Sequence, residues 1–453
     1  MINNNKSKSY IYCTPLLSEI ERIKKATHKP FYDPKFKDGR KVNGLNELLA
    51  QCFNVVVSHS TFCNATFETV EFIQNGQYTL ILDETIDVVS EYNNIIEGFG
   101  NKMTKADIKF LQDREAISVD EYGRVSWICD SYIGSNYSEV ERLAKRGNLI
   151  LVNETLFLWE FPVDILKAFE EIYVLTYLFN GSPLKAFFDY HSIPYKMHSV
   201  VELPECDREY RLCQYTPDTA ERAKFKKLIN ILEDEKLNDY PSGAFSSTWF
   251  KNNANKPIMK SVKNDLSNFF WNKTRAKASQ IMWTCISGTK DATRKALSGK
   301  GYTSVRQVTN ADKHKRLMEI ETYKLKKKLG RKPSKDEVAE LEASIIKEKK
   351  KLSDTETSKL QKKLDCFVPC NARASNDYRE RNVLAYILNM WPNTFVDNFF
   401  QRKGLEIDKD LFALGCMLQW IFRSAIRDDK EITIWAPSSR MRGLLADWLD
   451  GNI

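Results

Sequence analysis

The stretch Gln77-Tyr-Thr-Leu-Ile-Leu-Asp83-Glu84-Thr85 decides the fold of this chain. Its unbroken apolar run, rich in β-branched and aromatic residues, ends in two carboxylates and predicts a buried β-strand. Such strands lie inside parallel sheets that are covered by helices on both faces. Ligands of open α/β sheets bind at the carboxyl ends of the strands, where Asp83 can hold Mg²⁺ and Glu84 can orient an attacking water. A strand that simply ends at polar residues explains the pattern equally well.

Length and composition indicate a globular protein of two to three domains. The chain has 453 residues, of which 42% are hydrophobic and 28% are charged. No apolar run is long enough for a membrane span, and the polar start MINNNKSKS is not a secretory signal. The ten cysteines have no paired metal spacing, so we expect reduced thiols in a cytosolic protein. The net charge of +8 permits a polyanionic partner.

Two further strands precede this stretch, and each is followed by hydroxyl-bearing residues. Residues 9–13 read as a strand that ends at Thr14-Pro15, before an apolar helix. Residues 54–57 read as a buried strand, and Ser58, His59 and Thr61 follow it directly.

This order of elements resembles the superfamily 2 helicases. The segment YIYCTPLLSEIERI is similar to motif Ia, the Ser/His/Thr cluster stands in the place of motif Ib, and LILDET is similar to the Walker B motif. The resemblance implies that Asp83 binds Mg²⁺ and that Glu84 activates water. It also implies a position on the nucleic-acid side for the following residues: Thr14, Ser58, His59 and Thr61.

The second half of the chain carries two further resemblances. The polar loop after Cys366, which contains Arg373 and Asn376, resembles motif V and implies contacts near the domain cleft and with nucleic acid. Residues 411–427 read as a helix with Gln419, Arg423 and Arg427 on one face, similar to motif VI. The resemblance implies that Arg423 stabilises the transferring phosphoryl group. Arg427 follows four residues later, where the family has three.

Together these motifs resemble the DEAD/DEAH-type helicases of bacteriophages and related mobile elements. The resemblance implies two RecA-like α/β domains, residues 1–200 and 201–453, which use ATP and Mg²⁺ to move on or remodel nucleic acid. We expect DNA rather than RNA as the partner, no membrane, and a location in the cytoplasm of a bacterial host cell. The alternative from another class is a nucleic-acid-binding protein that has this fold but no catalytic activity.

A P-loop is absent from the sequence. The pattern G-x-x-x-x-G-K-[ST], whose backbone amides and lysine hold the nucleotide phosphates, does not occur. We therefore expect an N-terminally truncated helicase whose first sheet lacks a central strand and has unpaired backbone groups at the vacated position. A family member that has lost ATP binding and kept nucleic-acid binding is the alternative.

Residues 304–365 differ from their surroundings because they are dense in Lys and Glu. The sequence predicts one helix from Asn310 to Leu329 with Gly330 as its stop, and a second that starts at a capping box after Pro333. We expect a basic helical hairpin inserted in the second domain. Three interpretations remain open: a solvated surface, an arm that lies on nucleic acid, or a docking site for a protein partner.

Residues 222–234 read as an amphipathic helix.

Overall fold

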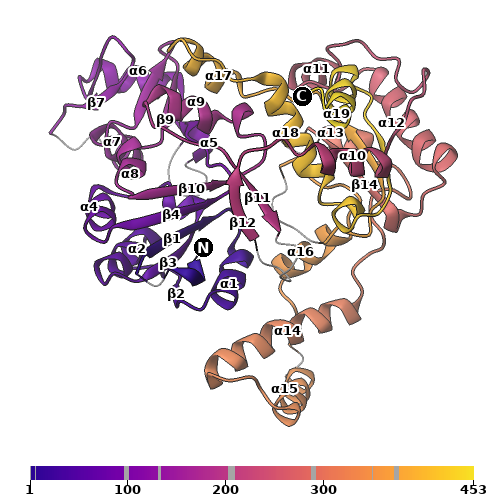
Figure 1. Ribbon diagram of the computed structural model, residues 1–453, viewed down its shortest axis with the longest axis horizontal. Coiled ribbons are helices and arrows are strands. Elements are labelled where there is room, and N and C mark those ends of the chain that lie inside the picture. The colour runs from indigo at the N-terminus through magenta and orange to yellow at the C-terminus, as the bar shows by residue number, and fades with distance from the viewer. Residues whose placement is uncertain are drawn as a thin grey trace. The chain divides into compact units, whose positions relative to one another are not determined.

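The computed structural model describes residues 2–5, 7–95, 102–130, 134–202, 210–286, 292–348, 350–371 and 377–453. The chain forms two compact units (Figure 1). Unit 1 comprises Met1–Pro217 and Trp391–Gly415, and unit 2 comprises Asp218–Met390 and Cys416–Ile453. Within the described residues, no helix combines the length and the apolarity that a membrane span requires.

The later segment of unit 1 was assigned to the second domain in the sequence prediction. It carries α17 (Thr394–Gln401), whose Phe399 and Phe400 are buried in the core of unit 1. Local sequence patterns identify this helix but cannot say which core its aromatic face joins.

Unit 1 is built on a five-stranded parallel sheet in the order β10-β4-β1-β3-β2. The strands are β1 (Ser9–Thr14), β2 (Phe31–Tyr32), β3 (Asn54–Ser58), β4 (Tyr78–Asp83) and β10 (Glu171–Leu175). The predicted strand at LILDET is confirmed as β4, whose residues from Tyr78 to Leu82 are all buried. Figure 1 shows the sheet among helices, which confirms the predicted α/β class.

The two faces of this sheet have separate cores, because successive strand residues point to opposite faces. Tyr10, Tyr12 and Ile81 pack with α1 (Leu17–Ala26) on one face. Ile11, Leu80 and Leu82 belong to the large core on the other face. That face packs against α2 (Lys41–Ala50), α3 (His59–Phe62) and α4 (Phe67–Asn75).

No vacant position lies beside β4 in this sheet. β4 pairs with β1 on one side, with Tyr10 opposite Thr79, and with β10 on the other, with Glu171 opposite the same residue. Both backbone edges of β4 are therefore hydrogen-bonded. β10 is the edge strand, and within the described residues its outer edge pairs with no further strand, so a strand missing at that edge stays a prediction.

The rest of unit 1 forms a smaller, mostly antiparallel layer. The sheet β5-β9-β8 and the hairpin β6-β7 share the large core with the surrounding helices. These elements are β5 (Val89–Glu91), α5 (Tyr92–Ile95), α6 (Lys105–Asp113), β6 (Ile117–Val119), β7 (Val125–Trp127), α7 (Ser138–Lys145), β8 (Leu149–Val152), β9 (Leu156–Glu160), α8 (Val163–Lys167) and α9 (Pro183–Tyr190). A separate antiparallel pair follows, β11 (His198–Glu202) with β12 (Tyr210–Gln214).

Unit 2 has a four-stranded parallel sheet in the order β13-β16-β15-β14. Its strands are β13 (Ile229–Ile231), β14 (Ile281–Cys285), β15 (Val383–Ile387) and β16 (Ile432–Trp435). Its helices are α10 (Thr219–Leu228), α11 (Ser247–Asn253), α12 (Ile258–Asn268), α13 (Ala292–Leu297), α18 (Lys409–Ile421, which crosses the boundary between the units) and α19 (Ser439–Asp450). The helix expected over residues 222–234 is wrong in its second part, because Ile229–Ile231 pairs with β16 as an edge strand.

The basic hairpin is confirmed as a helical segment of unit 2, hereafter the arm. It consists of α14 (Asn310–Leu329), α15 (Lys335–Lys347) and α16 (Asp354–Leu364). Gly330 ends α14 with a φ of +69°, a left-handed conformation that glycine adopts without strain. Ser334 and Glu337 form the predicted capping box of α15.

Candidate functional site

The candidate site lies where the chain changes direction in the sheet of unit 1. From β1 the chain moves to β2 and β3 on one side, and then returns to β4 on the other side of β1. In open α/β sheets, ligands bind outside the carboxyl ends of the strands at such a switch point. Thr14 ends β1 and Asp83 ends β4, so these two residues face the crevice between the strands.

Hydrogen bonds join Asp83 to two of the residues expected from the sequence. The Thr14 hydroxyl donates to Asp83 Oδ2 at 3.3 Å, and His59 Nε2 lies 2.8 Å from the Asp83 carbonyl oxygen. Ser58 and Thr61 form a separate pair, in which Ser58 caps α3 by accepting from the Thr61 amide. Thr14 is fully buried and His59 is partly exposed, so the Asp83 network reaches the surface through His59.

Asp83 is a partly desolvated carboxylate. Burial raises its pKa above the ordinary value, and the Thr14 hydroxyl and the charge of Arg22 offset only part of this rise. Burial and the nearby carboxylate together raise the pKa of Tyr12 to about 12, so that phenol stays protonated. Binding a cation or a proton would stabilise a carboxylate that is partly desolvated at a ligand crevice. Such carboxylates are typical of functional positions.

Glu84 adopts a backbone conformation that is unusual for its residue type. Its φ is +64°, in the left-handed region, where non-glycine residues are destabilised by about 1–2 kcal/mol. Its amide donates to the Leu175 carbonyl at 3.0 Å, which ties the end of β4 to the end of β10. Strained backbone of this kind is concentrated at binding and catalytic sites.

Metal binding at this site would depend on a ligand. Within the described ranges, no group of three or more His, Cys, Asp or Glu side chains could hold a metal ion. Mg²⁺ is commonly bound through one or two carboxylates together with substrate phosphates and water. Asp83 therefore fits a metal that arrives with a nucleotide, and does not form a metal site by itself.

The predicted helix face of Gln419, Arg423 and Arg427 is wrong. α18 ends at Ile421, and Arg427 lies in a separate short 3₁₀ turn, Ala425–Asp428. Gln419 and Arg427 are exposed, whereas Arg423 is only 8% exposed. The helix stops because the amides of Phe422, Arg423 and Ser424 close the last turn tightly. Arg373 and Asn376 lie outside the described residues.

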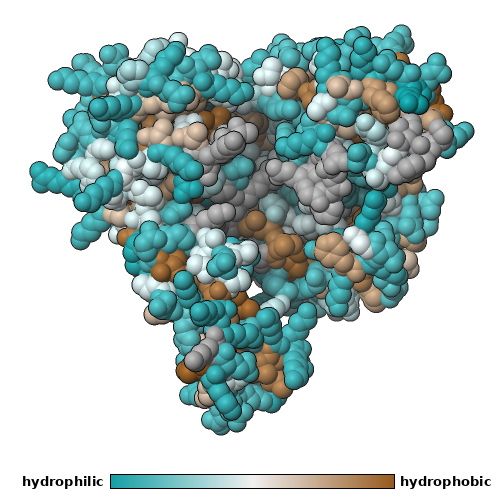
Figure 2. Space-filling view, turned by 180° about the vertical axis from the view of Figure 1, so that it is seen from behind, coloured by the Kyte–Doolittle hydropathy of each residue, from teal (hydrophilic) through white to brown (hydrophobic). Residues whose placement is uncertain are grey.

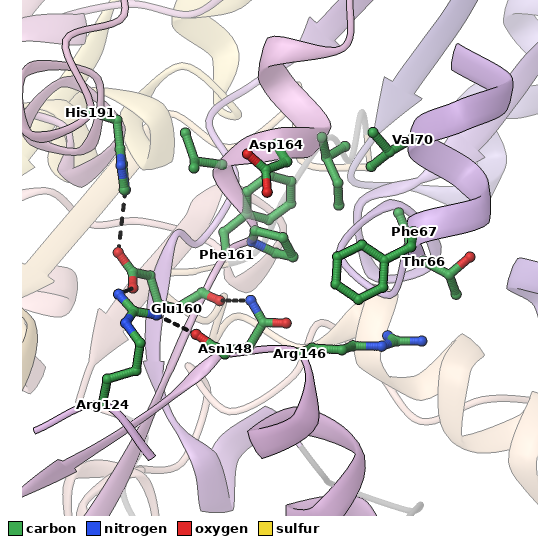
Figure 3. A pocket seen from close by; sticks show the side chains of 15 residues that line it. Thr66, Phe67, Val70, Arg124, Arg146, Asn148, Glu160, Phe161, Asp164 and His191 are labelled. Atoms are coloured by element: carbon green, nitrogen blue, oxygen red, sulfur yellow. Dashed lines mark hydrogen bonds and ion pairs between the residues drawn. The ribbon is translucent and has the colours of Figure 1, made fainter. Parts of the chain in front are cut away.

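A second polar cluster, which the sequence analysis did not single out, lines a pocket elsewhere in unit 1. Figure 3 shows Glu160 at the end of β9 between His191 and Arg124. Glu160 Oε2 accepts from Arg124 at 2.9 Å, and Glu160 Oε1 lies 3.3 Å from His191 Nε2. Burial raises the pKa of Glu160, but the hydrogen bond from His191 and the charge of Arg124 outweigh it and hold the pKa below its usual range.

The pocket beside this cluster has a volume of about 140 Å³. Asn148, Arg146 and Phe67 also line it, and the Asn148 amide donates to the Glu160 carbonyl at 3.0 Å. Burial and the nearby charges of Arg142 and Arg40 lower the pKa of Arg146. The sequence signal for this cluster was the same as for Asp83, an apolar strand that ends in a carboxylate, here LFLWE.

Comparisons with known proteins match two parts of the chain. A family model described as "YonV C-terminal Rossmann-like domain" matches residues 223–449, and one described as "YonV middle domain" matches residues 96–159. The "SPbeta prophage-derived uncharacterized protein YonV" of Bacillus subtilis (strain 168) is 31% identical over 463 residues, which cover 99% of this chain and 93% of that protein. The C-terminal match spans the parallel sheet of unit 2, and the middle match includes Arg124 and Asn148.

Proposed function

The chain belongs to the YonV family, and on that premise we propose that it is a nucleic-acid-binding protein with a helicase-like α/β fold. The observation that carries this proposal is the network at the carboxyl ends of β4, β1 and β3. It joins Asp83 to Thr14 and His59, which the helicase resemblance assigns to the nucleic-acid side. We place this activity in the cytoplasm of a bacterial host cell, with DNA preferred to RNA, in keeping with the prophage origin of the relative.

Binding without hydrolysis is the form that the fold favours. A hydrolase of the helicase type holds the β- and γ-phosphates on a P-loop. The sequence contains no P-loop pattern. Among the described residues, the crevice offers the Asp83 carboxylate and the Thr14 hydroxyl.

Nucleic-acid binding can be tested by fluorescence anisotropy with labelled single-stranded and duplex DNA and RNA. We expect salt-dependent binding of the wild-type chain. His59→Ala should weaken it by roughly fivefold, corresponding to the loss of about 1 kcal/mol from one hydrogen-bonding group. Ser60→Ala is the matched control, because Ser60 is exposed on the same turn and its side chain lies outside the network. A wild-type chain that binds none of the four probes would refute the proposal.

The second candidate function is nucleic-acid-stimulated ATP hydrolysis. Two observations favour it: the desolvated Asp83 at the switch point and the strained Glu84 next to it. In this case Asp83 would hold Mg²⁺ with the nucleotide and Glu84 would activate water.

Phosphate release with and without DNA separates the two candidates. Hydrolysis that is present in the wild type and lost in Glu84→Gln would support the second candidate, because the amide cannot act as a base. Unchanged DNA binding with no hydrolysis in either protein would leave the first candidate standing.

A further inference from the structure

We propose that the tip of the arm, residues 326–335, binds the phosphate backbone of nucleic acid. The inference rests on the proposed function and assigns the surface that makes the salt-dependent contacts. It is independent of the Asp83 network, because it is carried by the architecture and the charge of the arm alone.

The arm is an ordered substructure with a defined neck. Ser304 and Asp365 form an isolated β-bridge, and the Val305 amide donates to the Leu364 carbonyl at 2.8 Å. Gln361 closes the neck further by donating to Ser304 Oγ at 2.8 Å and accepting from the Val308 amide at 3.0 Å. Leu317 of α14 and Ile345 of α15 are buried and give the arm a small apolar core.

The tip is held at a distance from the neck. α14 has 20 residues, so it spans about 30 Å between the neck and Gly330. In the loop beyond Gly330, Arg331 forms an ion pair with Glu337 at 2.7 Å, and Glu337 also accepts from the Ser334 amide. The tip thus lies at the far end of a long helix, next to a hydrogen-bonded turn (Figure 1).

Charge in the arm is sorted along its length. Residues 304–365 contain 18 Lys and Arg against 11 Asp and Glu, so the arm alone accounts for nearly all of the net charge of +8. Near the middle of the arm, Glu321 binds Lys324 and Lys350, and Glu356 binds Arg316 and Lys359. From residue 322 to residue 335 there is no acidic residue.

Apart from Lys324, the lysines of this acid-free stretch have no acidic partner among the residues that the structure describes. They are Lys326, Lys327, Lys328, Lys332 and Lys335, and all five are exposed. Figure 2 shows the arm as a largely hydrophilic surface.

Stabilisation of the fold does not explain this cluster. Lysines in the last turn of α14 interact favourably with the helix dipole, but the effect is confined to that turn. Lys332 lies beyond the helix, and Lys335 is the first residue of α15, where the dipole disfavours a cation. Crowded like charges destabilise the arm, so an external polyanion accounts for them better.

Nucleic acid fits this surface better than an acidic protein or an anionic membrane. Successive helical residues point about 100° apart, so the three adjacent lysines spread their charges around the helix instead of forming one shaped face. Lysine is depleted at protein interfaces, whereas it is a common partner of phosphates along a nucleic-acid backbone. The tip also lacks the large apolar face that lets a helix lie in a membrane surface.

The test compares two triple variants that remove the same charge from the same arm. The tip variant is Lys326→Gln/Lys327→Gln/Lys328→Gln, and the control is Lys324→Gln/Lys350→Gln/Lys359→Gln, whose ammonium groups are already paired. Binding of a labelled DNA duplex is measured between about 50 and 200 mM salt, where each lost phosphate contact lowers the slope of log K against log salt by about 0.9.

We expect the tip variant to lose about tenfold or more in affinity at the lower salt concentration and to lower the slope by about 2 to 3, with a much smaller change in the control. Equal losses of DNA affinity in the two variants would overturn the assignment, since the net charge of the arm would then explain them. DNA binding that is unchanged in the tip variant would also overturn it. So would DNA binding that is unchanged while binding to vesicles of phosphatidylcholine and phosphatidylserine is lost. A wild-type chain that does not bind DNA or RNA would instead refute the proposed function.

Discussion

Asp83 and Glu160 are both carboxylates at the ends of buried strands of unit 1, yet their environments are opposite. Glu160 is contacted by a guanidinium and an imidazole, and its pKa is lowered. Asp83 is contacted by a neutral hydroxyl, and its pKa is raised. A buried acid with a guanidinium partner stabilises the fold, whereas one hydrogen-bonded to a hydroxyl is available for a ligand. The difference separates a structural carboxylate from a candidate functional one.

The largest expected effect comes from breaking the Glu160 cluster. Glu160→Gln removes the buried charge that pairs with Arg124, whose side chain is 38% exposed, and we expect unit 1 to lose about 2 kcal/mol in its free energy of unfolding. Urea denaturation followed by tryptophan fluorescence measures this loss, because Trp159 lies next to the site in the same buried strand. Asp164→Asn is the control, since this pocket acid is exposed. Equal stability of the two variants would show that Glu160 is not the structural acid.

A smaller effect of opposite sign is expected at the other carboxylate. Asp83→Asn removes a charge that burial disfavours, so we expect unit 1 to gain about 1 kcal/mol at neutral pH while nucleic-acid binding weakens. The measurement is the same denaturation experiment together with the anisotropy assay. A destabilised Asp83→Asn protein would mean that Asp83 also has a structural role, and the contrast with Glu160 would then fail.

The smallest expected effect is the pH dependence of the stability changes that Glu160→Gln and Asp83→Asn cause. The folded-state pKa of Glu160 is lowered, so its stabilisation is complete above the unfolded-state pKa and is lost as the pH falls through the folded-state value. The folded-state pKa of Asp83 is raised, so its destabilisation is absent below the unfolded-state pKa and grows as the pH rises through the folded-state value. The stability loss of Glu160→Gln and the stability gain of Asp83→Asn, both relative to wild type, should therefore become smaller as the pH falls. Unfolding experiments across the acidic range measure both. Differences that do not change with pH would show that charge is not their origin.

Local pattern predicted much of the fold. The apolar run of β4, the stop at Gly330 and the capping box of Ser334 and Glu337 were all identifiable, because each depends on neighbours within a few residues. Ile229–Ile231 was mistaken for helix because a three-residue edge strand is too short to show an alternating pattern. The end of α18 at Ile421 was missed because Phe422 and Arg423 continue a helical spacing that the chain does not follow.

The candidate site was predicted in part for the same reason. The apolar run before Asp83 was enough to expect this carboxylate at the ligand-binding edge of a parallel sheet, and the helicase resemblance added Thr14 and His59. The Glu160 cluster was missed because Arg124, Glu160 and His191 come from separate elements, and nothing local in the sequence links them.

By itself, the sequence determined the α/β class, the strand that ends in Asp83 and the basic helices of the arm, because hydrophobic periodicity, capping residues and charge are local properties. Only the tertiary structure decided that β10 pairs with β4, that α17 joins the core of unit 1, and that two similar carboxylates receive different partners. These outcomes depend on which distant surfaces meet, and the free energy of burying and pairing them is a property of the whole fold.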